Sequence, residues 1–122
     1  MSTRAHLQVR ETTGPGNGAR AGRNSRKGSM QPLILFRLGR LCATNGAIRT
    51  LTSAAADPIE YVARHLAGNW GDVDPVDAAA NDRALQLGER IISAYQLADG
   101  AKIWIITEAD RSATTILLPS EY

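Results

Sequence analysis

The chain has 122 residues, of which 43% are hydrophobic, and a formal net charge of +2 at pH 7. This length allows at most one ordinary domain. The single cysteine, Cys42, excludes an internal disulfide and a cysteine-based zinc site. No apolar run is long enough for a signal-peptide core or a membrane span, so we expect a cytoplasmic protein without membrane association.

The charge is divided unevenly along the chain. Residues 1–29 carry six basic side chains and one acidic side chain, a net charge of +5, whereas residues 30–122 carry eight basic and eleven acidic side chains, a net charge of −3. The first segment has almost no large apolar residues and cannot bury enough surface to offset the entropy lost on ordering. We interpret residues 1–30 as a disordered basic tail and residues 31–122 as a single small domain.

The tail leaves three interpretations open. It can bind nucleic acid weakly and without sequence preference, because such binding gains its free energy from counterion release. It can also be a solvated extension, or the natural protein can start at Met30, with residues 1–29 added by an over-long reading frame. We favour the second and third interpretations.

The domain begins with an apolar stretch, residues 33–44, which predicts a short strand, with a helical turn as the alternative. Thr44 or Asn45 can cap the helix that follows. Two further helices are predicted by an aspartate followed by proline, at Asp57 and Asp74, where the carboxylate accepts from free N–H groups and proline needs no donor. The first of these helices ends at Gly68, and the second is capped by Gly88.

After the last helix, the apolar period changes to that of strands. Three strands are predicted, over residues 90–97, 101–108 and 114–118, and their short connections indicate an antiparallel meander. The middle strand is apolar on both faces, so one face needs the helices and the other needs either more chain or a partner. The expected fold is α+β: a disordered basic N-terminal tail, a short strand, two to three helices, then a three-stranded antiparallel β-meander.

Two short stretches, residues 64–72 and 102–111, hold both tryptophans and one of the two histidines. Neither contains a Gly-rich phosphate loop, a Ser–His–Asp order or a zinc-binding spacing. We therefore expect no catalytic residue, no metal ligand and no cofactor. The residues nominated for binding are Trp70, Asp72, Trp104, Glu108, Asp110 and Arg111.

The same stretches allow an alternative, a small metal-dependent hydrolase or nuclease. Carboxylates at strand ends are common metal ligands, and a histidine on an apolar helix stripe can be a base or a ligand. This alternative assigns catalysis to His65, Asp72, Glu108 and Asp110, which must converge within a few ångströms. The same residues also have structural interpretations. His65 can be a core histidine, Asp72 can belong to a helix entry, and Glu108 and Asp110 can lie at a solvated hairpin tip.

Four segments resemble a group of small bacterial proteins found on plasmids, phages and integrated elements: residues 38–44, 64–72, 89–95 and 102–122. Members are labelled plasmid-related proteins and sometimes type I restriction–modification subunits. The chain has neither a methyl-donor glycine loop nor an Asn-Pro-Pro-Tyr-type motif. The resemblance therefore implies a mobile-element context more than an activity, and it places the usual start near Met30.

Together these observations favour a non-catalytic accessory protein of a bacterial mobile element. It is expected to act by binding a protein partner or itself, because no coherent active site is visible and the middle strand is apolar on both faces.

Overall fold

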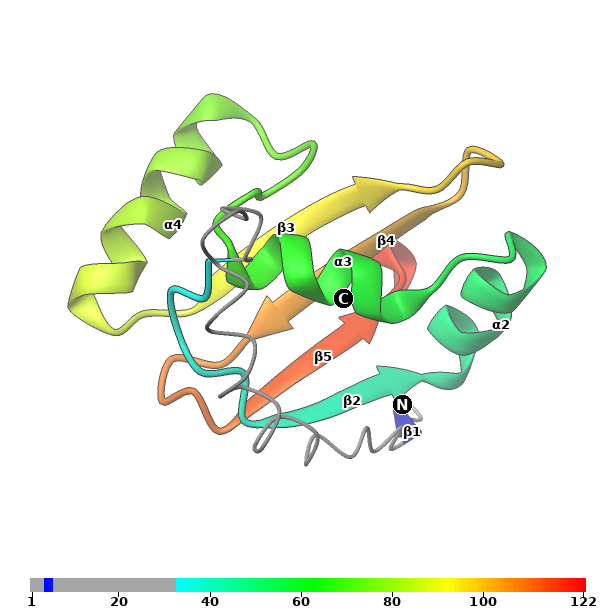
Figure 1. Cartoon of the computed structure of the whole chain (residues 1–122), viewed down its shortest axis with the longest axis horizontal. Helices are drawn as coiled ribbons and strands as arrows, with labels where there is room; N and C mark the ends of the chain where they lie inside the picture. The colour runs from blue at the N-terminus through cyan, green and yellow to red at the C-terminus, as the bar shows by residue number, and fades with distance from the viewer. Residues whose placement is uncertain (1–3, 6–32) are drawn as a thin grey trace, which may run out of the picture.

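The structure is a computed structural model that describes residues 4–5 and 33–122 (Figure 1). The predicted disordered tail, residues 1–30, therefore lies outside the described residues, apart from Arg4–Ala5. These two residues form strand β1 and pair with the edge of β2 in antiparallel orientation.

The remaining elements follow in the order strand, three helices, three strands and a short 3-10 turn. Their bounds are β2 Arg40–Thr44, α2 Asn45–Ser53, α3 Pro58–Leu66, α4 Pro75–Leu87, β3 Ile91–Gln96, β4 Lys102–Thr107, β5 Ala113–Leu117 and η2 Pro119–Glu121. None of the helices in the described part of the chain is long and apolar enough to cross a membrane.

The predicted helix starts are confirmed. The side chains of Thr44, Asp57 and Asp74 each accept a hydrogen bond from a backbone N–H group in the first turn of α2, α3 and α4, respectively. Gly88 closes α4 with a left-handed backbone, at φ 70°. These boundaries depend on neighbouring residues only, which is why local sequence predicts them.

The sheet corrects the prediction of a three-stranded antiparallel meander. The last three strands do pair in antiparallel orientation, β3 with β4 and β4 with β5. However, β2 pairs with β5 in parallel orientation, so the sheet is mixed and has the order β1-β2-β5-β4-β3. The parallel pair is possible because the three helices and two strands between β2 and β5 supply the long crossover that it needs.

The predicted first strand is also too long. Only Arg40–Thr44 of the apolar stretch 33–44 joins the sheet. The backbone N–H of Leu35 donates instead to the carbonyl oxygen of Leu66, at 2.8 Å, so the segment before β2 lies against the end of α3 at Leu35.

The helices cover one face of the sheet (Figure 1). Side chains alternate along the strands, and those on the covered face pack with α2 and α3 in one buried core. That core includes Leu41, Ala43, Ala47, Leu51, Val62, Ile103, Ile105 and Ile116. Near α4, Ala84, Trp70 and Ile91 form a second buried cluster.

We call the opposite side the helix-free face, because the residues that it carries belong to neither of these two buried clusters. By strand alternation and register it carries Thr44, Trp104, Ile106, Thr115 and Leu117. The Trp104 side chain is partly exposed there, next to η2 in space. The prediction that β4 is apolar on both faces is thus confirmed, and only one of these faces receives the helices.

Candidate functional site

His65 lies in the core and has no exposed surface. Its Nδ1 is 2.6 Å from the Ser93 hydroxyl, and its Nε2 is 2.8 Å from the Thr107 hydroxyl. The Thr107 hydroxyl is in turn 2.7 Å from that of Thr114, which donates to the carbonyl oxygen of Leu38 at 2.8 Å. A single chain of hydrogen bonds therefore runs from β3 through α3, β4 and β5 to the segment before β2.

Proton counting fixes the direction of this chain. Thr114 has one hydroxyl proton and gives it to Leu38, so Thr107 donates to Thr114 and accepts from Nε2–H of His65. In the neutral imidazole Nδ1 accepts from Ser93, whereas in the imidazolium it would donate to the same hydroxyl oxygen.

The surroundings of His65 favour this neutral state. Burial and, to a smaller extent, the positive charge of Arg111 lower the pKa of His65 from 6.5 to about 3. The Ser93–His65 pair resembles a nucleophile with its base, but Ser93 is also fully buried. A substrate has no access to either group, so this cluster acts as a structural polar core.

The loop Asn69–Asp72 covers the edge of β3. The N–H of Asp72 donates to the carbonyl oxygen of Ala94 at 2.7 Å, and the N–H of Ala94 donates to that of Trp70 at 3.0 Å. Gly71 lies opposite Ala94 with φ 77°, and a Cβ atom there would overlap the Ala94 carbonyl oxygen. The loop therefore behaves as a short extra strand that needs glycine at position 71.

Trp70 anchors this loop. Its side chain is 6% exposed, and its Nε1 donates to a carboxylate oxygen of Asp82 at 3.1 Å. Asp72 is exposed. Of the two nominated binding residues here, Trp70 closes the core, and only Asp72 presents its side chain to solvent.

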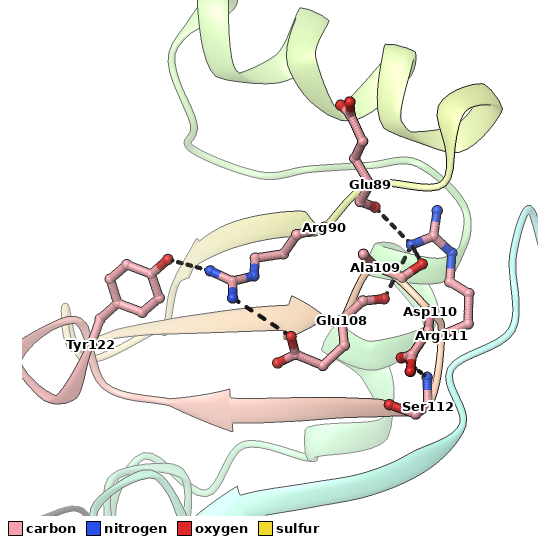
Figure 2. A network of polar contacts seen from close by, with 8 residues as sticks. All are labelled: Glu89, Arg90, Glu108, Ala109, Asp110, Arg111, Ser112 and Tyr122. Carbon is pink, nitrogen blue, oxygen red and sulfur yellow. Dashed lines mark hydrogen bonds and ion pairs between the residues drawn. The ribbon is translucent and has the colours of Figure 1, made fainter.

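Arg111 joins the β4–β5 loop to the end of α4 (Figure 2). Its Nη1 donates to the carbonyl oxygens of Glu89, Glu108 and Ala109 at 2.7, 3.1 and 3.1 Å, and its Nη2 donates to that of Ala84 at 3.0 Å. A cation at the C-terminal end of a helix is also favoured by the helix dipole. Arg111, which was nominated for binding, thus uses its guanidinium group to connect the β4–β5 loop with the end of α4.

Asp110 sits at the exposed tip of the same loop. One of its carboxylate oxygens accepts from the Ser112 N–H at 2.9 Å. Hydrogen bonds from the Ser112 side chain and backbone lower the pKa of Asp110. This is the geometry of a turn closed by an aspartate, and it leaves the second oxygen available to solvent.

A group of partly exposed side chains lies on the helix-free face: Arg90, Trp104, Glu108 and Tyr122. The rings of Trp104 and Tyr122 meet edge to face, with centroids 5.3 Å apart. Nη1 of Arg90 donates to the Tyr122 hydroxyl at 2.8 Å, and Nη2 lies 3.6 Å from a carboxylate oxygen of Glu108 (Figure 2). We call these four residues the aromatic–ionic cluster.

Trp104 and Glu108 were predicted from the sequence as binding residues, whereas Arg90 and Tyr122 were not. A signal for Arg90 was present, since the antiparallel register of β3 and β4 pairs Ile91 with Thr107 and so sets Arg90 opposite Glu108. Tyr122 had no such signal, because it follows the last strand and reaches the cluster through the turn η2.

The four residues of the hydrolase alternative do not assemble in the described chain. His65 is in the core, Asp72 is at the edge of β3, and Glu108 and Asp110 belong to the β4–β5 loop. Among residues 4–5 and 33–122, no group of three or more His, Cys, Asp and Glu side chains is placed to hold a metal ion. The geometry therefore gives no support to metal-dependent hydrolysis.

No family model matches the chain, and neither a curated protein nor a solved structure shows significant similarity to it.

Proposed function

We propose that this protein is a non-catalytic binding protein that acts through contact with another protein or with a second copy of itself. The observation that carries the proposal is the helix-free face, where the aromatic–ionic cluster leaves Trp104 partly exposed and Tyr122 61% exposed. Tryptophan, tyrosine and arginine are the residues that contribute most free energy at protein interfaces.

The chemistry of the described residues also favours binding over catalysis. The one described histidine is buried, neutral and hydrogen-bonded at both nitrogens. The strand-end carboxylates are engaged by Arg90 and by the Ser112 N–H.

The charge of the domain favours a protein partner over nucleic acid. Residues 30–122 carry a net charge of −3, which opposes the approach of phosphate. The resemblance of the sequence to plasmid- and phage-borne proteins supports, as a proposal, an accessory role in a bacterial mobile element.

The test compares two exposed apolar positions. Trp104→Gln removes the ring of the aromatic–ionic cluster, and Val76→Gln changes a side chain that is 75% exposed on α4. We expect the parent chain to self-associate in analytical ultracentrifugation or to bind a host protein reproducibly. The Trp104 variant should weaken this association and the Val76 variant should not. A parent chain that stays monomeric and binds nothing, or association that ignores Trp104, contradicts the proposal.

Nucleic-acid binding is proposed only for the basic residues 1–29. Their deletion should abolish retention on DNA at low salt, because the remaining domain is negatively charged. Tight DNA binding by the shortened chain at physiological salt would place the site in the domain and contradict this assignment.

A further inference from the structure

We propose that residues 119–122 form a displaceable strap on the helix-free face, and that this face receives a partner segment with the same chemistry, a carboxylate next to an aromatic ring. This inference rests on the proposed function and specifies both its surface and its partner. The strap consists of η2 and Tyr122. The side chains of Glu121 and Tyr122 each occupy one binding position on the sheet, and we call these two positions the seats.

The first seat holds the carboxylate of Glu121. One of its oxygens accepts from the Thr44 hydroxyl at 2.7 Å and from the Leu118 N–H at 2.8 Å. Thr44 is the N-cap of α2, so the negative charge lies at the positive end of that helix. Gly46 leaves the necessary space, because a Cβ atom there would be only 2.5 Å from the other Glu121 oxygen.

The second seat holds the ring of Tyr122. The indole of Trp104 meets this ring edge to face. Figure 2 shows the Arg90 guanidinium donating to the Tyr122 hydroxyl. Both contacts select a phenol: the ring packs on the indole and the hydroxyl accepts from a cation. The two seats together therefore match an acidic residue followed by tyrosine.

The strap is attached in a way that allows it to leave. Its helical part is a single three-residue turn, and Tyr122 keeps 61% of its surface exposed. The side chains of Arg90 and Glu108 are 48% and 43% exposed, so water competes for their polar contacts. Segments with few buried contacts open locally without unfolding of the domain.

Opening would create a binding surface of defined chemistry. It would free the Thr44 hydroxyl and the space beside Gly46, and it would uncover the edge of Trp104. A partner segment competes with a strap that is tethered to β5, and tethering gives the strap a high effective concentration. The closed strap thus weakens binding to the parent chain without abolishing it, and a partner that adds further contacts displaces it more readily.

The test uses a fluorescent peptide with the sequence of residues 117–122, Leu-Leu-Pro-Ser-Glu-Tyr. Fluorescence anisotropy measures its binding to the full parent chain and to a full-length double variant, Glu121→Ala with Tyr122→Ala. We expect the double variant to bind about tenfold tighter or more, since its own strap no longer occupies the seats. Ser120→Ala is the matched control, because it changes an exposed strap residue and should bind as weakly as the parent.

Specificity is tested with a second peptide in which glutamate and tyrosine are replaced by alanine, which should not bind the double variant. Adding Arg90→Gln to the double variant should weaken binding of the original peptide, because the hydroxyl then loses its donor. Thermal unfolding confirms that each variant is folded. If the double variant does not fold, Tyr122→Ala alone is held to the same criterion.

Three results would overturn the proposal: a folded variant that does not bind the peptide, equal binding by parent and variant, or dimerisation of the variant without peptide binding. The last result would assign the face to a second copy. These failures are separate from failure of the proposed function, which is judged by Trp104-dependent association of the parent chain.

Discussion

The two faces of the sheet differ in how their polar groups are satisfied. On the helix-covered face, Ile103, Ile105 and Ile116 are fully buried, and the hydroxyl and imidazole groups around His65 are closed into one internal chain. On the helix-free face, Arg90 and Glu108 meet in contact with water. Groups withdrawn from water must keep their partners, whereas exposed groups can exchange theirs for solvent. The polar groups of the first face are thus held by their buried partners, whereas Arg90 and Glu108 on the second face can exchange theirs for water.

The largest loss of stability is expected on substitution of Gly71, which lies in the loop that covers the edge of β3. Gly71→Ala should lower the free energy of unfolding by about 3 to 4 kcal/mol, because the new Cβ would overlap the Ala94 carbonyl oxygen and detach the loop from β3. Gly100→Ala is the control: its φ is also positive, at 93°, but no atom lies within 4 Å of a Cβ there. It should cost about 1 kcal/mol. Urea unfolding of both variants measures the difference, and equal losses would contradict the role of the loop.

His65→Leu should be the next most damaging change, with a loss of about 2 to 3 kcal/mol. Leucine fills much of the space but leaves the buried Ser93 hydroxyl without its partner and removes one partner of Thr107. The control is Thr52→Ala, which removes an exposed hydroxyl bonded to a helix carbonyl and should cost less than 1 kcal/mol. If His65→Leu is as stable as the parent, the polar chain does not stabilise the covered face.

The same histidine predicts a loss of stability in acid. The unfolded chain takes up a proton on His65 below about pH 6.5, whereas the folded chain resists protonation until its pKa of about 3. The unfolded state therefore binds more protons between these values, and stability falls with decreasing pH by up to about 1.4 kcal/mol per pH unit. Urea unfolding at a series of pH values should show this slope in the parent. His65→Leu should show a shallower one, and identical slopes would refute a buried neutral imidazole.

Arg111→Lys keeps the charge at the junction of the two regions but loses the planar fork. We expect a loss of about 1 to 2 kcal/mol, because one ammonium group cannot reach the carbonyl oxygens of both Ala84 and Glu89 together with those of its own loop. Arg83→Lys, at an exposed position on α4, is the control and should be neutral. Thermal unfolding decides between a fork-dependent junction and one that needs only a positive charge.

The sequence predicted those parts of the fold that depend on neighbouring residues. Asp57 and Asp74 start helices, and Gly88 ends one, through contacts within a few positions. The parallel pairing of β2 with β5 joins residues more than seventy positions apart, such as Arg40 and Ala113, and no local pattern reports it. The apolar run before β2 was misread as strand, because Phe36 and Leu38 pack on the core outside the sheet and the apolar residues 33–35 stay exposed.

Residue type alone indicated which residues of the candidate site matter, but it did not indicate what they do. Trp70 and Arg111 stood out correctly, yet both hold the fold, through Asp82 and through backbone carbonyl oxygens, respectively. The predicted strands 90–97 and 101–108, paired as a hairpin, set Arg90 opposite Glu108, whereas the return of Tyr122 to Trp104 depends on the turn η2. Long-range side-chain contacts of this kind are set by tertiary packing and not by sequence spacing.

The smallest expected effect sharpens the contrast between the faces. Tyr122→Phe keeps the ring on Trp104 and removes only the hydroxyl that accepts from Arg90, so it should cost about 0.5 kcal/mol or less, because water replaces the lost partner. Tyr122→Ala also removes the ring pair and should cost about 1 kcal/mol. Both losses are far below that of Gly71→Ala, although the tyrosine changes remove contacts between residues distant in the chain. A loss of about 2 kcal/mol in the unfolding free energy of Tyr122→Phe would contradict this contrast. The hydrogen bond of the Tyr122 hydroxyl would then have the strength of a buried one, and the helix-free face would stabilise the fold as much as the helix-covered face does.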